Sequence, residues 1–327
     1  VVSALSGITD ALYNISTLAA KGKKTKKNEL ETIQFRHFDI IDQTVSFSKR
    51  DQVKQKITLL FEELSNIFKG VFLIKDCPDR ISDTIVSYGE RISSEIISYV
   101  IDNAEWKDST EFIKTNPQFG KHVVDFDLTN ELIKKSFSKM PKCTVCGGFV
   151  SSDANSGNKT NLGRGGSDYT AAILASALGA SLLEIWTDVD GFMTADPRII
   201  NTAYVIDRLS FVEAMELCNF GAKVLYPPTI YPVFHKNIPI CIKNTFRPEL
   251  AGTFISHEKT DEPSKAIKGI SSINDTSLIT VRGLGMVGVI GVNYRIFKAL
   301  AKNGISVFLV SQAASENTIS FAVRNAD

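Results

Sequence analysis

The glycine-rich segment Gly163-Arg-Gly-Gly-Ser-Asp-Tyr-Thr170 restricts the fold of this chain more than any other feature. It leads into an alanine-rich stretch, Tyr169–Leu178, that predicts a helix, and Gly179 is suited to end that helix as a C-cap. The apolar stretch Leu182–Thr187 then predicts a buried strand. A glycine loop that opens a helix before such a strand is typical of an α/β domain, in which ligands lie beyond the carboxyl ends of the strands.

The flanking segments extend this pattern. Apolar residues at helical spacing predict helical structure from Glu29 to Phe68, ended by Gly70, and a second helix over Asp83–Ile101. Thr144–Val150 predicts a strand that runs into a glycine pair, and Ser151–Gly166 predicts a polar loop. We therefore expect a three-layer αβα sandwich with a largely parallel sheet.

A second, smaller unit is expected after the polar segment Glu258–Lys265, which we interpret as a linker between residues 1–262 and 263–327. The pattern predicts a βαββ order that stops abruptly at Asp327, with the elements Ser277–Val281, Val292–Lys302, Ser306–Val310 and Thr318–Val323. The abrupt opening Val1-Val-Ser3, without a methionine, suggests that the chain begins inside a larger protein.

Composition excludes several classes of function. The net charge of +1 over 327 residues gives no global attraction for nucleic acid or for a membrane surface. The five cysteines, an odd number in so long a chain, argue against a disulfide framework and for a reducing compartment, so we expect a cytoplasmic protein. Cys143 and Cys146 have C-x-x-C spacing, but two small residues on a buried strand explain it better than a redox or metal site.

The glycine-rich segment carries the strongest chemical signal. Its two adjacent glycines allow a close backbone approach to a ligand, and the first amides of the following helix suit an anion. Arg164 offers a planar fork that fits a carboxylate, and Asp168 can accept hydrogen bonds from an ammonium group. Together they match the two ends of an α-amino acid. The alternative is a glycine-rich turn with a capping aspartate.

Two further clusters are weaker when taken alone. Trp186-Thr-Asp-Val-Asp-Gly191 and Asp196-Pro-Arg198 offer carboxylates for Mg²⁺ or a ribose and a cation for phosphate, although turn formation also explains them. Lys223 follows a glycine turn and can neutralise phosphate charge, whereas a solvated surface lysine is the simpler interpretation.

Taken together and in this order, the motifs resemble those of aspartate kinases, members of the amino-acid kinase superfamily. The similarity is greatest to the kinase half of bifunctional aspartate kinase–homoserine dehydrogenases. It rests on Ser3-Ala-Leu-Ser-Gly-Ile-Thr9, Tyr88-Gly-Glu-Arg91, Gly163–Thr170, Trp186–Arg198 and Phe220–Pro227, and more closely on Glu184–Gly191, Glu213-Ala-Met-Glu-Leu217 and Ile242-Lys-Asn-Thr245. The resemblance implies ATP-dependent phosphorylation of the L-aspartate side chain to 4-phospho-L-aspartate, the first step of aspartate-family (Lys, Thr, Met and Ile) biosynthesis.

The resemblance also implies residue roles, with ATP and Mg²⁺ as cofactors and no metal-ligating side chain assigned. On the substrate side Arg164 would bind the α-carboxylate of aspartate, Asp168 and Glu90 its ammonium group, Ser167 and Thr9 would orient it, and Ser3 would lie near the transferred phosphoryl group. The nucleotide side would comprise Thr187, Asp188, Met193, Asp196, Arg198 and Lys223, of which Arg198 and Lys223 act with Ser3 in catalysis.

Three departures from the family pattern are visible. The lysine-bearing Lys-Phe-Gly-Gly strand that opens the family's domain is absent from this sequence. Met193 stands where a tyrosine is common, and Tyr226 replaces the usual histidine before Pro227.

The second unit contains a motif that permits two interpretations. Gly283-Leu-Gly-Met-Val-Gly288 matches the dinucleotide-binding pattern, but the next strand ends in Ser311-Gln312 rather than in the acid such sites require. The unit instead resembles the first ACT-type regulatory module of aspartate kinases. That resemblance implies pairing of modules in a homo-oligomer and an amino-acid effector, threonine, contacted by Gln312.

Two alternatives for the whole chain remain open at this level. One is another amino-acid kinase that acts on glutamate or acetylglutamate. The other is a non-catalytic regulatory protein that binds an amino acid on a kinase fold.

Overall fold

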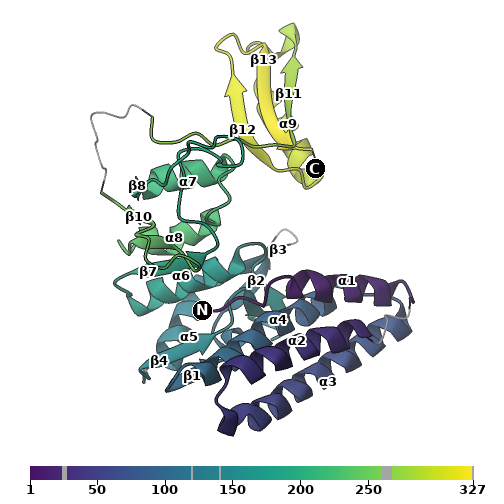
Figure 1. Cartoon of the computed structure of the whole chain (residues 1–327). Coiled ribbons are helices and arrows are strands. Elements are labelled where there is room, and N and C mark those ends of the chain that lie inside the picture. Colours follow the sequence, from purple (N-terminus) through teal and green to yellow (C-terminus); the bar gives the residue numbers. More distant parts are fainter. Residues whose placement is uncertain (24–27, 119–120, 140, 259–266, 326–327) are drawn as a thin grey trace.

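The computed structural model describes residues 1–23, 28–118, 121–139, 141–258 and 267–325 (Figure 1). The expected domain boundary at residues 262 and 263, and all of the expected linker except Glu258, lie outside these segments. Within them, none of the helices combines the length and the apolar character that crossing a bilayer requires.

Four helices form one side of the molecule (Figure 1): α1 (Ile8–Ala20), α2 (Asn28–Thr44), α3 (Arg50–Ile74) and α4 (Asp79–Val100). Their apolar stripes pack against one another in one core cluster. The expected single helical region Glu29–Phe68 is wrong in detail, because a short 3₁₀ turn at Phe47–Lys49 separates α2 from α3. Gly70 does not end α3, whose buried stripe continues to Val71.

Two sheets lie next to these helices. One pairs β1 (Ala104–Lys107) in parallel with β4 (Cys143–Cys146). The other has the order β3-β2-β5-β6 and combines β3 (Lys121–Val124), β2 (Lys114–Gln118), β5 (Val150–Asp153) and β6 (Lys159–Asn161). The predicted loop Ser151–Gly166 therefore contains two strands.

A third sheet has the order β7-β9-β10-β8 and contains β7 (Leu183–Thr187), β9 (Ile240–Asn244), β10 (Thr253–Ser256) and β8 (Arg208–Ser210). The helices beside the second and third sheets are α5 (Phe126–Ser136), α6 (Gly166–Leu178), α7 (Phe211–Asn219) and α8 (Ile230–Phe234). The expected α/β class is confirmed, with sheets that mix parallel and antiparallel pairs. Gly179 ends α6 in the left-handed conformation, as predicted.

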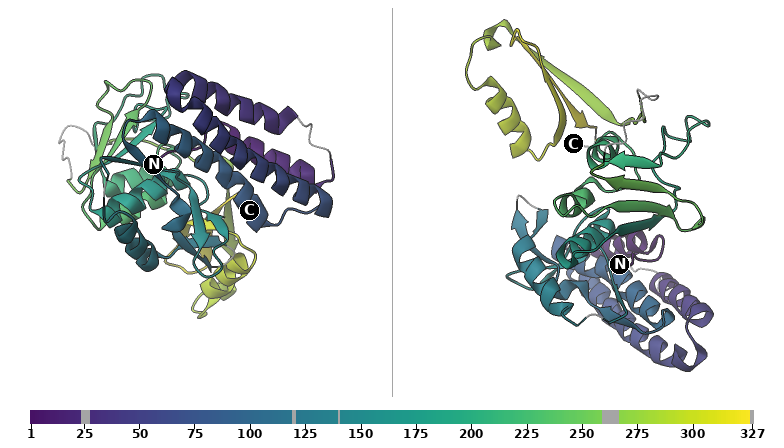
Figure 2. Two further views of the ribbon diagram at one scale, coloured as in Figure 1. Left: turned by 90° about the horizontal axis from the view of Figure 1, so that it is seen from below. Right: turned by 90° about the vertical axis from the view of Figure 1, so that its left-hand side faces the viewer.

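The second unit has the predicted βαββ order: β11 (Thr276–Arg282), α9 (Val292–Lys302), β12 (Val307–Gln312) and β13 (Thr318–Arg324). It stands at the opposite end of the molecule from α1–α4 (Figure 2). Its sheet has the order β11-β13-β12, and both pairings are antiparallel. A dinucleotide-binding unit pairs its first two strands directly and in parallel, whereas here β13 lies between β11 and β12 and is antiparallel to both, so this topology rules out that interpretation of the glycine motif.

The segment that enters the second unit, residues 267–272, packs on the larger domain, and we call it the strap. Lys268 forms an ion pair with Glu213 at 2.8 Å, and the Ile270 N–H donates to the Thr194 carbonyl at 2.8 Å. A Cβ at Gly221 would lie 1.9 Å from the Ser272 carbonyl oxygen. The strap therefore contacts both the segment after β7 and the turn that carries Lys223.

Candidate functional site

The glycine pair Gly147-Gly148, just after β4, holds three distant segments together. Gly148 donates its N–H to the Val2 carbonyl at 2.9 Å, which aligns the N-terminal segment beside β4. A Cβ at Gly147 would lie 3.1 Å from the Glu90 carbonyl oxygen in α4, and a Cβ at Gly148 would lie 2.6 Å from the Cα of Ser167 in α6. Because glycine has no side chain, α4 can approach Gly147 and α6 can approach Gly148 this closely.

Glu90 is the most unusual carboxylate in this region. Its side chain projects from α4, the residue is 4% exposed, and its Oε2 has no hydrogen-bond partner among the described residues. Burial raises the pKa of Glu90 to about 7, and the N–H groups of Ala4 and of Glu90 itself act in the opposite direction. A buried carboxylate with a free oxygen is suited to receive a cationic group.

Ser167 and Asp168 lie in the first turn of α6. The helix begins after Gly165, which has φ 71° and makes no side-chain cap, so the alternative of a capping aspartate is not what the structure shows. Burial raises the pKa of Asp168 to about 6. A second desolvated carboxylate therefore lies one residue beyond the Ser167–Gly148 contact.

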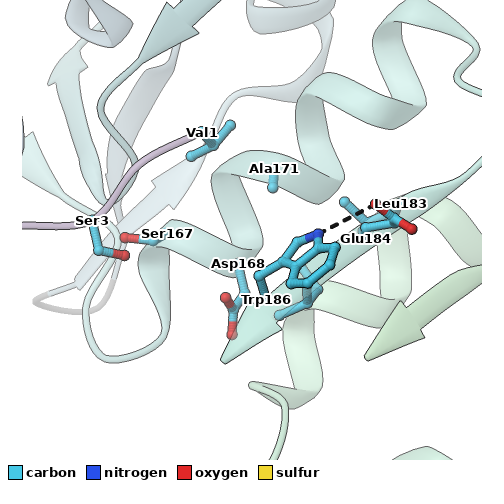
Figure 3. A pocket seen from close by; sticks show the side chains of 9 residues that line it. Val1, Ser3, Ser167, Asp168, Ala171, Leu183, Glu184 and Trp186 are labelled. Atoms are coloured by element: carbon cyan, nitrogen blue, oxygen red, sulfur yellow. Dashed lines mark hydrogen bonds between the residues drawn. The ribbon is translucent and has the colours of Figure 1, made fainter. Parts of the chain in front are cut away.

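A cavity of about 280 Å³ joins these residues to β7. Its lining includes Ser3, Ser167 and Asp168 on one side and the strand residues Leu183 to Trp186 on the other. In the view of Figure 3, the Ser3 and Ser167 side chains lie on one side of the cavity, and the Asp168 carboxylate lies nearer the Trp186 indole. The cavity thus lies between the expected substrate residues and the strand that leads to the expected nucleotide residues.

The two remaining substrate candidates differ in placement. Thr9 lies in the first turn of α1, with its Oγ1 3.8 Å from the position of a Cβ at Gly89, and therefore faces the turn of α4 that carries Glu90. Arg164 is exposed on the loop before α6, and within the described segments its guanidinium has no hydrogen-bond or ion-pair partner. Tyr226 packs against Gly165 beside it, where a Cβ would lie 2.3 Å from the tyrosine Cβ.

The nucleotide candidates begin at the carboxyl end of β7. Thr187 donates its hydroxyl to the exposed Asp188 carboxylate at 3.2 Å. Asp190, the second acid of the motif, accepts from Asn244 at 2.7 Å and forms an ion pair with Arg247. Asp190 therefore anchors the turn after β7 to the end of β9, while Asp188 remains accessible.

Asp196 and Arg198 form a tight pair on the surface. The guanidinium donates two hydrogen bonds to the carboxylate, at 3.0 and 2.7 Å, and these bonds lower the pKa of Asp196 to about 2. The exposed Lys223 lies close enough to lower that pKa further. Met193, earlier in the same segment, forms an antiparallel bridge with Val205.

Several residues of the site were not identified from the sequence. Trp186 and Glu184 line the cavity and are joined by a 3.2 Å hydrogen bond. Their alternation with the buried Leu183 and Ile185 was a visible signal that both face outward from β7. Ser93 and Ser109 are buried, and their hydroxyls donate to the Ser3 and Gly147 carbonyls. No comparable sequence pattern indicated these two residues.

The C-x-x-C pair does not form a functional cluster. Cys143 and Cys146 are free, and three residues of separation place them on opposite faces of β4. Burial raises the pKa of the Cys146 thiol, which opposes reactivity. Within the described segments, no group of three or more acidic, histidine or cysteine side chains is placed to hold a metal ion.

Comparison with known proteins gives two family matches. Residues 1–244 match the model of the amino acid kinase family, and residues 279–327 match that of an ACT domain. A bifunctional aspartokinase/homoserine dehydrogenase 2 from Arabidopsis thaliana is 34% identical over 340 residues, which cover 99% of this chain. The chain spans only 36% of the length of that relative.

This chain covers a larger share of two Escherichia coli matches. Lysine-sensitive aspartokinase 3 is 33% identical over 319 residues, which cover 95% of this chain and 68% of that protein. A crystal structure of aspartokinase III in complex with aspartate and ADP has a TM-score of 0.85 at 30% identity, covering 99% of this chain and 71% of that one.

Proposed function

This chain belongs to the amino acid kinase family and, within it, to the aspartokinases, and on that premise we propose that it phosphorylates the side-chain carboxylate of L-aspartate with MgATP. The observation that carries the proposal is the pair of desolvated carboxylates at Glu90 and Asp168, brought to opposite sides of the Gly147-Gly148 turn. One buried and one partly buried acid in the same region suit a substrate with an intact ammonium group. This favours a free amino acid over an N-acetylated one.

The chemistry requires little from the protein beyond placement and charge. An aspartate side chain is already ionised at neutral pH, so it needs no general base to attack the γ-phosphorus. The obstacle is the approach of an anion to a polyanion, which cations and amides aimed at the phosphoryl oxygens relieve. We assign Ser3 to the phosphoryl group, Lys223 and Arg198 to the phosphates, and Thr187, Asp188, Met193 and Asp196 to the nucleotide.

Magnesium fits this arrangement as part of the substrate. Mg²⁺ in kinases is typically held by one or two carboxylates together with the phosphates of the nucleotide. Asp188, which is exposed at the end of β7, is the carboxylate available for that role. Asp190 and Asp196 are engaged by arginine side chains.

The direct test is a phosphorylation assay of the complete gene product. With MgATP we expect hydroxylamine-trappable acyl phosphate from L-aspartate and none from glutamate or N-acetylglutamate. Preference for either of the other acids would overturn the substrate assignment. Calorimetric binding of aspartate without binding of MgATP would instead support the non-catalytic alternative.

Arg164→Ala is expected to raise the KM for aspartate about 10- to 100-fold. The guanidinium has no partner among the described residues and is proposed to bind the α-carboxylate, and a hydrogen bond to a charged group contributes about 1.5–3 kcal/mol. The KM for ATP should change little. Arg36→Ala provides a control, because that exposed arginine donates to the Ser6 carbonyl at 2.7 Å. Equal aspartate KM values in Arg164→Ala and wild type would remove Arg164 from the substrate site.

The affinity for aspartate should fall as the solution becomes acidic. Glu90 and Asp168 have pKa values of about 7 and about 6, so both are ionised above pH 7.5 and protonated in turn below it. A protonated carboxyl loses its attraction for the ammonium group. The aspartate KM should therefore rise between pH 8 and pH 6 while the ATP KM stays nearly constant. An aspartate KM that is flat over this range would contradict the roles of both acids.

Regulation by threonine is part of the proposal. In the second unit, Gln312 accepts a 2.7 Å hydrogen bond from the Asn293 amide, and both line a cavity of about 190 Å³ at the start of α9. The ACT-domain match supports an amino-acid effector in this unit. Inhibition by threonine that Gln312→Ala relieves is the expected result. One E. coli relative is a lysine-sensitive aspartokinase, so inhibition by lysine alone would identify lysine, and not threonine, as the effector.

We further propose that this unit forms a homo-oligomer interface. Its surface exposes apolar side chains, including Leu284 at 86%, Ile290 at 100% and Val310 at 53% exposure. Sedimentation of the complete gene product should show a dimer or larger assembly. We also propose that the protein acts at the start of aspartate-family biosynthesis and is located in the cytoplasm. A homoserine dehydrogenase domain as its partner completes the proposal.

A further inference from the structure

The peptide that joins Ser3 to Ala4 is held from both sides by α4. The Ser93 hydroxyl donates to the Ser3 carbonyl at 2.7 Å, and the Ala4 N–H of the same peptide faces the Glu90 carboxylate, where it acts to lower the pKa of that group. Ser93 follows Glu90 by three residues, so the two side chains lie on one face of the helix. One peptide unit thus contacts two successive turns of α4, through its oxygen and through its N–H.

This contact is partly buried and closely packed. Ser93 is 1% exposed, so water does not replace its hydroxyl as a donor. A Cβ at Gly89 would lie 2.9 Å from the Ala4 Cβ, which shows how near the N-terminal segment lies to the helix. The Glu90 carbonyl is a second, longer acceptor for Ser93 at 3.2 Å, so the Ser3 carbonyl is the principal one.

A peptide plane can rotate about its flanking Cα atoms without moving them far, and hydrogen bonds at its two ends prevent that rotation. Loss of the Ser93 donor would leave the Ser3 carbonyl without this partner. The peptide would then turn toward another donor and carry the Ala4 N–H away from Glu90.

We propose that Ser93 is a positioning residue for substrate binding: it fixes the Ser3–Ala4 peptide so that the Ala4 N–H stays on the Glu90 carboxylate and Oε2 remains free for the substrate ammonium group. The proposal rests on the function proposed above.

The test compares three variants at Ser93 with a matched serine on the same helix. Ser93→Ala should raise the aspartate KM about tenfold, the effect of losing one partly buried hydrogen bond, with the ATP KM within about twofold of wild type. Ser93→Thr keeps the hydroxyl and should restore the aspartate KM. Ser93→Cys, with a weak donor of similar size, should fall between them and serves if the threonine variant does not fold.

Ser98→Ala is the control, because Ser98 is also buried and donates only to the Glu95 carbonyl of its own helix, at 2.7 Å. It should leave both KM values unchanged. Equal rises of the aspartate and ATP KM values in Ser93→Ala would show general loosening and overturn the positioning role, as would an aspartate KM within twofold of wild type. If the wild-type protein phosphorylates another acid, the proposed function fails by itself, before any variant is compared.

Discussion

Replacing Glu90 by glutamine is expected to weaken aspartate binding and to stabilise the folded protein at the same time. Glutamine has nearly the same shape but no negative charge, so the substrate ammonium group loses a charged partner. Such a hydrogen bond contributes about 1.5–3 kcal/mol, which corresponds to a rise in aspartate KM of about 10- to 100-fold. The ATP KM should stay close to that of wild type.

The gain in stability follows from the raised pKa. In the folded protein the pKa of Glu90 is about 7, above the ordinary value of 4.5 that applies to the unfolded chain, so the folded state binds the proton more tightly. The cost of ionising the buried group is therefore absent below pH 4.5, grows as the pH rises, and is complete above pH 7. At about 1.4 kcal/mol per pKa unit it amounts to roughly 3 kcal/mol at pH 8.

Thermal unfolding of wild type and Glu90→Gln at pH 8 and at pH 5 measures this effect. The variant should be more stable at pH 8, with the difference much reduced at pH 5. Glu95→Gln is a matched control on the same helix, where the carboxylate forms an ion pair with Lys56 at 3.3 Å. A variant that loses stability at pH 8 while keeping its aspartate affinity would mean that Glu90 has a structural role only.

Replacing Gly148 by alanine should reduce kcat/KM for aspartate about 100-fold. The new Cβ would lie 2.6 Å from both the Cα and the Cβ of Ser167, and the Cα belongs to the backbone of the first turn of α6, which cannot rotate away. The start of α6 must then move, together with Ser167 and Asp168. Misplacement of reacting groups by about 1 Å costs on the order of 100-fold in rate.

The same substitution should lower stability by about 1–3 kcal/mol, the usual cost of overpacking. Gly70→Ala is the control, because a Cβ at that position in α3 meets nothing within 4 Å. It should stabilise the protein by about 0.5–1 kcal/mol and leave the kinetics unchanged. Wild-type kinetics in Gly148→Ala would show that the close approach of α6 to Gly148 is not needed for activity.

The sequence predicted best those elements in which local preference and burial agree. The helix after the glycine-rich segment, its end at Gly179 and the strand Leu183–Thr187 were all identified within a few residues. The βαββ unit was also identified in order, because its strands are apolar and its turns contain glycine. These signals are local, so no knowledge of tertiary contacts was required.

The strands β5 and β6 were missed for a physical reason. They are short, and their buried positions include hydroxyls instead of large apolar residues. Ser151 and Thr115 each bond the Thr160 hydroxyl at 2.8 Å, an interaction between segments far apart in sequence. From the sequence alone, a short polar strand that is stabilised by such contacts cannot be distinguished from a loop.

The same limit applies to the candidate site. Its motifs were found because each has a distinctive local pattern, and Glu90, Ser167 and Asp168 do surround one glycine turn. These residues come close because Gly147 and Gly148 have no side chains. That effect concerns contacts between segments far apart in the sequence, so no local pattern reveals it. The roles of all the candidate site residues remain predictions.

The strap connects the entrance of the second unit directly to the turn that carries Lys223. The Ser272 carbonyl fills the space beside Gly221, and the Ile270 N–H donates to the Thr194 carbonyl. With Lys223 at the nucleotide as proposed, a ligand that shifts the second unit would strain or break these contacts and thereby alter the affinity for the nucleotide. Thermodynamic linkage makes such coupling reciprocal. Cellular energy charge, through the occupancy of the nucleotide site, would then set how sensitively the protein responds to its end product.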